Sequence, residues 1–166
     1  MSFAARALER AKKLGADGLV ASAEMLVGNI LLAQSYPDRA VDHYRRALEI
    51  REGLENHDPY SRAILLENLG YCRLELREVD EGLAILEQAL ALASDVGDDR
   101  CRAECHQDLS FGHLLRDDLD AAAEHGRRAL DLSALHRRVS RRAHGPPGHP
   151  TGAAPGRDGI RSRRRR

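Results

Sequence analysis

The sequence predicts an all-α protein, a stack of about seven helices arranged as antiparallel hairpins and followed by a disordered tail. Three observations lead to this prediction. Apolar residues recur at the helical period through residues 2–136, small residues repeat at a fixed spacing, and the composition changes abruptly at Arg137. No stretch alternates apolar and polar residues for long enough to form a strand.

Turn and capping signals divide residues 2–136 into helices. Asp58 and Pro59 form the clearest start, with Asp58 as the N-cap and Pro59 in the first helical turn. Gly97 ends one helix and the aspartates after it cap the next, whereas Asp17 is a further candidate cap and the break near Arg77 is weak. We therefore expect helices at residues 2–14, 19–35, 37–54, 59–76, 79–94, 99–116 and 118–135.

The strongest signal is an internal repeat of small residues separated by 12, 4 and 3 positions. The three copies are Gly28, Ala40, Tyr44 and Ala47; Gly70, Gly82, Leu86 and Ala89; and Ser110, Ala122, Gly126 and Ala129. A half-copy precedes them at Ala4, Leu8 and Ala11. A small residue at a helix crossing lets the two axes approach to about 8 Å. One hairpin buries only part of its apolar surface, so the repeats must stack.

This pattern resembles the tetratricopeptide repeat family. The 42-residue separation of Ala47 and Ala89 is similar to that of the longer repeats found in kinesin light chains and many bacterial proteins. The resemblance implies a right-handed superhelical stack over residues 1–136, with three repeats and one preceding half-repeat. Ser110 and Gly126 depart from the family pattern, so we expect the third repeat to pack less tightly.

The resemblance also implies a function, the binding of a protein or peptide in a concave groove lined by the first helix of each hairpin. The candidate groove residues are Asn29, Glu67, Asn68, Tyr71, Glu75, Gln107, Asp108 and Phe111. Asn68 matches a position where the longer repeats often carry an Asn that bonds an extended peptide backbone. Tyr71 and Phe111 occupy equivalent places and could form an aromatic shelf. The alternative for each residue is an ordinary solvated or half-buried helix position.

The charge of the candidate groove predicts the kind of partner. None of its residues is basic, whereas tetratricopeptide domains that clamp the acidic C-termini of heat-shock chaperones need Lys and Arg there. We therefore expect a neutral or basic partner and no carboxylate clamp.

Residues 137–166 form a different kind of segment, with ten Arg and one Asp and no Leu, Lys or Glu. Residues 1–136 instead hold 16 Lys and Arg against 25 Asp and Glu. Such a basic, apolar-poor tail cannot bury enough surface to fold. It could bind nucleic acid by charge alone, which is the less favoured reading. Its composition also matches GC-rich coding sequence read out of frame.

Candidate chemistry is sparse. Cys101, Cys105 and His106 share part of one helix, but a zinc site needs four ligands and no CxxC pair occurs, so small buried thiols are the favoured reading. Glu67, Glu75, Glu104 and Asp108 could pair as acid and base, yet no nucleophile or phosphate-binding loop accompanies them. We therefore expect no enzyme activity, no metal site and no cofactor.

The sequence thus predicts a non-catalytic interaction scaffold. The alternative is that the repeats form one module of a larger bacterial transcriptional regulator or signalling protein. Three cysteines that lie in helical patterns favour a cytoplasmic protein, and the composition typical of GC-rich coding favours a bacterial one. Because no 18-residue apolar run occurs, we expect no transmembrane helix and no membrane partner. We also expect weak self-association through uncapped repeat ends, where an apolar stripe comprises Leu119, Leu130, Leu132 and Leu135.

Overall fold

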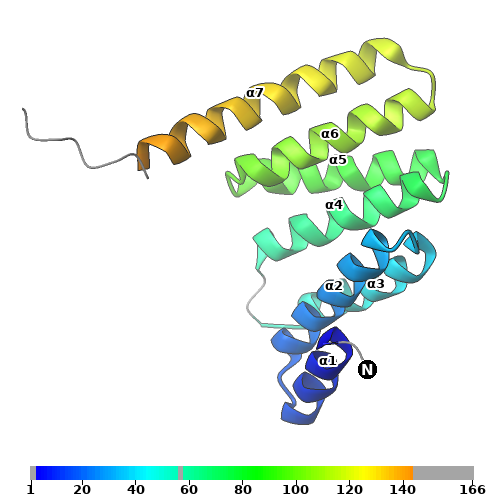
Figure 1. Ribbon diagram of the computed structural model, residues 1–166, viewed down its shortest axis with the longest axis vertical. Helices are drawn as coiled ribbons and strands as arrows, with labels where there is room; N and C mark the ends of the chain where they lie inside the picture. The colour runs from blue at the N-terminus through cyan, green and yellow to red at the C-terminus, as the bar shows by residue number, and fades with distance from the viewer. Residues whose placement is uncertain (1–2, 56–57, 144–166) are drawn as a thin grey trace, which may run out of the picture.

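The computed structural model describes residues 3–55 and 58–143, and all of its regular structure is helical (Figure 1). The helices are α1 (Phe3–Leu14), α2 (Asp17–Ala33), α3 (Pro37–Glu52), α4 (Pro59–Glu75), α5 (Val79–Asp95), α6 (Asp99–Leu115) and α7 (Leu119–Ala143). Hairpins form from α2 with α3, α4 with α5 and α6 with α7. The predicted all-α stack is confirmed, and the predicted limits agree within two residues up to the start of α7.

Tight turns join most of the helices, and each of them holds one residue with positive φ. That residue is Gly15 (φ 62°) or Gly97 (φ 71°) in two turns, but Ser35, Arg77 and Asp117 take the corresponding place in three others. A left-handed residue after a helix lets the following amides bond its last carbonyls. The break near Arg77 carries a weak sequence signal because this turn closes without the usual glycine.

Two of the predicted caps are confirmed and one is wrong. The carboxylates of Asp58 and Asp98 accept backbone N–H bonds of 3.0–3.1 Å at the starts of α4 and α6. Asp17 does not cap α2, because the helix begins at Asp17 itself, with Ala16 before it and no side-chain bond. The short turn draws Asp17 into the first helical turn, where a negative charge still complements the helix dipole.

The predicted helix crossings at small residues are present in the structure. Gly70 and Gly82 face each other between α4 and α5, where a methyl group on Gly70 would lie 3.1 Å from the Gly82 carbonyl oxygen and 2.7 Å from Leu86. Gly28 lies against the ring of Tyr44 between α2 and α3, where a methyl group on Gly28 would lie 2.7 Å from Tyr44 Cε1. These crossings leave no room for a side chain, so they fix how close the helices come.

The third crossing is more open, as the sequence predicts. A methyl group on Gly126 would meet only the Ser110 hydroxyl, at an ordinary 3.5 Å. The Ser110 hydroxyl donates to the Ala122 carbonyl at 2.8 Å, so a polar bond replaces part of the close packing. Among the side chains that the structure describes, the clusters of buried apolar residues draw on α2 to α6 and include no residue of α7.

Helix α7 is longer than predicted. It ends at Ala143 and not near residue 135, and Figure 1 shows it reaching past the end of α6. Residues 137–143 hold four arginines, which are good helix formers and favour the negative end of the helix dipole. The division into a repeat domain at 1–136 and a tail at 137–166 stays a prediction, and residues 144–166 of that tail lie outside the described residues.

The first helices of successive hairpins lie on one side of the stack. Helix α6 packs against α4 as well as against α5, so it contacts a helix that does not adjoin it in the chain. We call the surface formed by α2, α4 and α6 the inner face. Within the described residues, no helix combines the length and the apolarity needed to span a bilayer.

Candidate functional site

The inner face holds a pocket of about 360 Å³ between α2 and α4. It is lined by Asn29, Leu32, Ala33, Tyr44, Asn68 and Tyr71. The Tyr44 hydroxyl donates to Asn29 Oδ1 at 2.8 Å and also lies 3.4 Å from Asn68 Oδ1. The Asn68 amide nitrogen donates to the Ile64 carbonyl at 2.8 Å. The pocket therefore presents two amide side chains in orientations fixed by neighbouring bonds.

Two aromatic rings continue this surface from α4 to α6. The centroids of Tyr71 and Phe111 lie 6.3 Å apart with the rings tilted by 42°, and both side chains are half-buried. Burial and a hydrogen bond to Glu75 raise the pKa of Tyr71 to about 12, so its hydroxyl stays protonated. The predicted equivalence of Tyr71 and Phe111 in successive repeats thus brings the two rings into contact.

A pair of carboxyl groups forms a second link between α4 and α6. Burial raises the pKa of both Glu67 and Asp108, and the neighbouring Asp108 carboxylate raises that of Glu67 further. Asp108 is only 6% exposed, and the Glu67 carboxyl donates a hydrogen bond to it. The pair therefore holds one proton at neutral pH and carries about one negative charge rather than two. No metal or nucleophile is needed to explain this arrangement.

The remaining predicted site residues lie at the edges of this surface. Glu75 and Gln107 are exposed, Glu75 beside Tyr71 and Gln107 on α6. Glu104, considered above as a catalytic partner, accepts a bond of 3.0 Å from Arg100 one helical turn earlier. The structure thus connects Asn29 and Asn68 in one pocket, and Glu67, Tyr71, Asp108 and Phe111 in two contacts between α4 and α6.

Sequence reasoning missed the role of Tyr44 in this surface. The repeat pattern assigns Tyr44 to packing, and its ring is indeed completely buried beside Gly28. Its hydroxyl, however, extends from the outer helix α3 to the inner face and orders both asparagines. The sequence does hold one signal for this role. Leu86 fills the same repeat position as Tyr44 with an apolar side chain, so the hydroxyl of Tyr44 is not needed for packing alone.

The three cysteines are free thiols in the core. Cys101 and Cys105 are 1% and 0% exposed and hydrogen-bond each other on α6, while Cys72 is buried on α4. The Cys105 thiol donates a hydrogen bond to Cys101. This bond and burial raise the pKa of Cys105, so its thiol stays protonated and packs as a small apolar group. Within the described residues, no group of three or more His, Cys, Asp or Glu side chains is placed to hold a metal ion.

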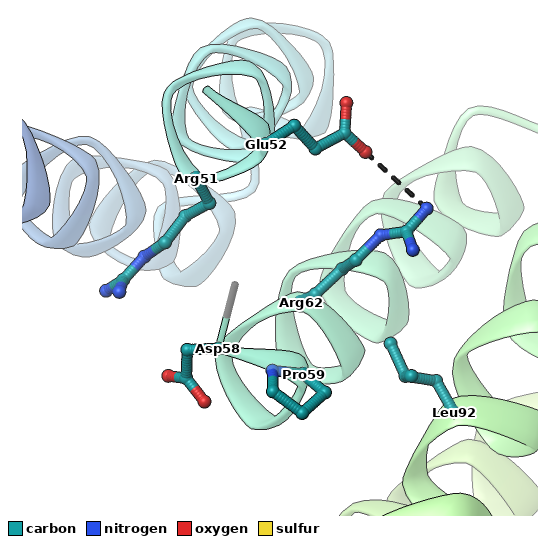
Figure 2. Close-up of a pocket in the computed structure, with 6 residues that line it drawn as sticks. All are labelled: Arg51, Glu52, Asp58, Pro59, Arg62 and Leu92. Carbon is teal, nitrogen blue, oxygen red and sulfur yellow. Dashed lines mark ion pairs between the residues drawn. The ribbon is translucent and has the colours of Figure 1, made fainter. Parts of the chain in front are cut away.

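A larger pocket of about 450 Å³ lies at one edge of the stack, between α3, α4 and α5 (Figure 2). It is lined by Arg51, Glu52, Asp58, Pro59, Arg62 and Leu92. Arg62 pairs with Glu52 at 3.5 Å, whereas Arg51 points away from Arg62 and donates to the Ser22 hydroxyl at 3.0 Å. Two acidic and two basic groups face this space without converging, so it lacks the focused charge of an ion-binding site.

The repeat geometry agrees with comparisons to known proteins. Residues 61–134, which span α4 to α7, match the model of the tetratricopeptide repeat. This part of the chain belongs to the tetratricopeptide repeat family. Folds of this family generally act as protein–protein interaction scaffolds.

Solved structures of repeat proteins share the fold at low sequence identity. The crystal structure of BtubC (BKLC) from P. vanneervenii superposes with a TM-score of 0.67 and 18% identity, over 82% of this chain and 56% of that chain. The tetratricopeptide repeat domain of Arabidopsis FLU gives 0.62 and 18%, over 70% of this chain and 95% of that domain. This chain thus spans little more than half the length of BtubC. A comparison with curated proteins finds no match.

Proposed function

We propose that this tetratricopeptide repeat protein is a non-catalytic scaffold that binds a neutral or basic peptide segment on its inner face. The carrying observation is the continuous surface from the Asn29–Asn68 pocket to the Tyr71–Phe111 ring pair. Asparagine side chains offer both a donor and an acceptor, which suits the backbone of an extended peptide. Half-buried aromatic rings offer apolar area with little loss of side-chain entropy on binding.

The charge of this surface supports a neutral or basic partner. The Glu67–Asp108 pair contributes about one negative charge and Glu75 contributes another beside Tyr71. Arg100, on the same helix as Gln107 and Phe111, pairs with Glu104 at 3.0 Å, which offsets its positive charge. An acidic peptide would therefore meet like charges, which cost binding energy and slow association.

Selection of random short peptides on the immobilised full chain tests this proposal. We expect the enriched peptides to carry zero or positive net charge. The double variant Tyr71→Ser/Phe111→Ser should weaken binding of the enriched peptides at least about tenfold, because aromatic contacts at an interface centre carry much of the affinity.

The matched control for this selection is Tyr36→Ser. Tyr36 is an exposed aromatic residue, 48% exposed, and it precedes the outer helix α3 with Arg39 stacked over its ring. This variant should bind the selected peptides as the wild type does. Equal losses in Tyr36→Ser and in the Tyr71/Phe111 double variant would count against the inner face.

A comparison of equivalent positions in the three hairpins favours a second interaction. Leu130 on α7 follows Ala129 as Leu90 follows Ala89 and Leu48 follows Ala47. Leu48 and Leu90 are half-buried against clusters that include residues of α4 and α6, whereas Leu130 is 68% exposed. The position that receives the next helix in two hairpins is therefore bare in the third.

We propose that a second copy of this chain covers that position weakly, in a head-to-tail contact. The other end of the stack offers a mainly apolar pocket of about 360 Å³ between α1 and α2. It includes the exposed side chains of Leu14 (63%), Leu19 (57%) and Leu26 (38%). A contact between two different surfaces does not close on itself, so the mean mass should rise gradually with concentration.

Sedimentation velocity over a range of concentrations tests the contact between copies. The variants Leu130→Ser and Leu19→Ser should each reduce the rise in mean mass, since each removes apolar area from one side. Leu114→Ser, at a 52% exposed site on α6, is the control and should leave the rise unchanged. A wild-type chain that stays monomeric at high concentration contradicts this second proposal.

We also propose a cytoplasmic location, which the three free cysteines support. Membership of a larger bacterial regulator or signalling protein stays a prediction.

A further inference from the structure

Three histidine rings lie in series between α6 and α7. His106 on α6 and His125 on α7 place their Nδ1 atoms 3.0 Å apart, with ring centroids 5.2 Å apart. The ring of His113, two turns further along α6, stacks on His125 at 5.3 Å with an interplanar angle of 23°. The short N···N contact is a hydrogen bond only if one ring donates and the other accepts, so at least one of the two rings must be neutral.

The surroundings of the cluster oppose a positive charge on its central rings. His106 is only 5% exposed, and burial lowers its pKa to about 4, with His125, Arg128 and Arg102 acting in the same direction. Burial also lowers the pKa of His125, and His113 and Arg128 lower it further. The facing charged groups are Arg102 on α6, Arg128 and Glu124 on α7, Glu87 on α5, and Asp118, which lies 3.5 Å from His113. Glu124 and Glu87 favour the charged form but do not outweigh burial.

Helix α7 packs against α6, and the contact between His106 and His125 is one of the polar contacts that join these two helices. No α7 side chain that the structure describes belongs to the buried apolar clusters of the core. Leu119, Leu130 and Leu135 point outward and are 49–68% exposed. Among the α7 side chains that the structure describes, Ala122 is buried, with 4% of its surface exposed. Helix α7 is attached to the stack through α6, on its outer end (Figure 1). A polar contact that fails on protonation can therefore release α7 without opening the rest of the core.

We propose that the contact between His106 and His125, with His113 stacked on His125, holds α7 in place at neutral pH and releases the helix when acid charges His106 and His125. Protonation of His106 and His125 together places two positive charges in the space of one hydrogen bond, beside Arg102 and Arg128. Acid favours the released state because the histidines bind protons more readily there than in the attached state. In the released state a histidine takes up its proton near pH 6.5, but in the attached state His106 does so only near pH 4.

The released state therefore binds more protons than the attached state between these two pH values, and acid favours it. For each such imidazole, the ratio of released to attached helix rises up to about tenfold per pH unit in this window. Above about pH 6.5 the ratio no longer depends on these rings. Because Phe111 and Gln107 lie on α6, loss of α7 would also uncover a helix that contributes to the inner face.

Nuclear magnetic resonance of the full chain between about pH 7.5 and pH 4.5 tests this proposal with two readings. The ring signals of His106 should show a midpoint well below the usual 6.5. In the same range the amide signals of α7 should broaden or move to unfolded positions before those of α2 to α5 change. Normal midpoints near 6.5 for His106 and His125, with α7 signals unchanged at the low end, would overturn it.

Two variants distinguish an effect of the histidine cluster on α7 from a general sensitivity of the fold to acid. His106→Leu/His125→Phe keeps bulk and ring stacking but cannot take up a proton, so α7 should stay attached to about pH 4.5. The control is His43→Gln, which changes the histidine bonded to Glu24 between α2 and α3 and should leave the release of α7 unchanged. Release of α7 at the same pH in the double variant and the wild type contradicts the proposal. If the double variant does not fold, the ring titration of the wild type decides alone.

Discussion

Gly70→Val is expected to lower the free energy of unfolding by about 2–3 kcal/mol or more. The first added carbon would lie 2.7 Å from Leu86 Cγ and 3.1 Å from the carbonyl oxygen of Gly82. A flexible side chain can move away from such a contact, but the backbone of Gly82 cannot move without separating α4 from α5. Both helices lie at the centre of the stack, so the strain reaches the crossings on either side.

The control is Gly126→Ala, in the equivalent α6–α7 crossing. Its added methyl group would meet only Ser110 Oγ at 3.5 Å, so helix propensity dominates and the variant should gain about 0.5–1 kcal/mol. Urea unfolding followed by circular dichroism measures both changes. Similar effects at Gly70 and Gly126 would contradict the conclusion that the α4–α5 crossing is tight and the α6–α7 crossing is open.

Tyr44→Ala is expected to cost about 3–5 kcal/mol, the usual range for removing a buried aromatic ring. Tyr44 is completely buried, and its ring fills the space above Gly28 between α2 and α3. The deletion leaves a cavity that the rigid crossing cannot close, and it also removes the hydroxyl that holds Asn29 and Asn68.

Tyr44→Phe separates these two contributions, because it keeps the ring and deletes the hydroxyl. We expect a loss of about 1 kcal/mol in stability, the usual net value of one hydrogen bond. Peptide binding should weaken more than stability suggests, since both asparagines of the pocket lose their common partner. Equal stability of Tyr44→Ala and Tyr44→Phe in urea would show that the ring does not fill the crossing as described.

Much of the fold was predictable because local and tertiary signals agree in this chain. The same small residues that recur in the sequence, such as Gly70 and Gly82, are the ones where two backbones nearly touch. Asp58 and Asp98 cap helices through bonds within three residues, so their role depends on local sequence alone. Helix α7 extends past its predicted end. The arginine-rich composition after residue 136 indicates a disordered tail, but arginine is a good helix former and continues a helix that has already begun.

The candidate site was predictable only in part, because it depends on contacts between helices. Register alone placed Tyr71 above Phe111, but no pattern indicates that the hydroxyl of Tyr44 would reach Asn29 and Asn68. The imidazole contact between His106 and His125 likewise joins residues 19 positions apart. Such pairs follow from the exact rotation of two packed helices, which periodicity does not determine.

Glu24 shows the same limit in the first hairpin. Its carboxylate is 3% exposed and lies 2.6 Å from His43 Nδ1, 3.4 Å from Arg46 Nε and 3.8 Å from Lys12 Nζ. It therefore ties α1, α2 and α3 together as a buried, multiply paired charge. In the sequence it is one acidic residue on a helix among many, and only the three partners distinguish it.

Titration of the isotope-labelled full chain with two extended peptides of equal length, one rich in lysine and one rich in glutamate, tests the proposed binding surface most directly. Amide shifts in the nuclear magnetic resonance spectrum report where each peptide binds and how tightly. The lysine-rich peptide should bind more tightly and shift signals around Asn68, Tyr71 and Phe111 on α4 and α6. Tighter binding of the glutamate-rich peptide, or shifts confined to the outer helices α3 and α5, would contradict the proposed function.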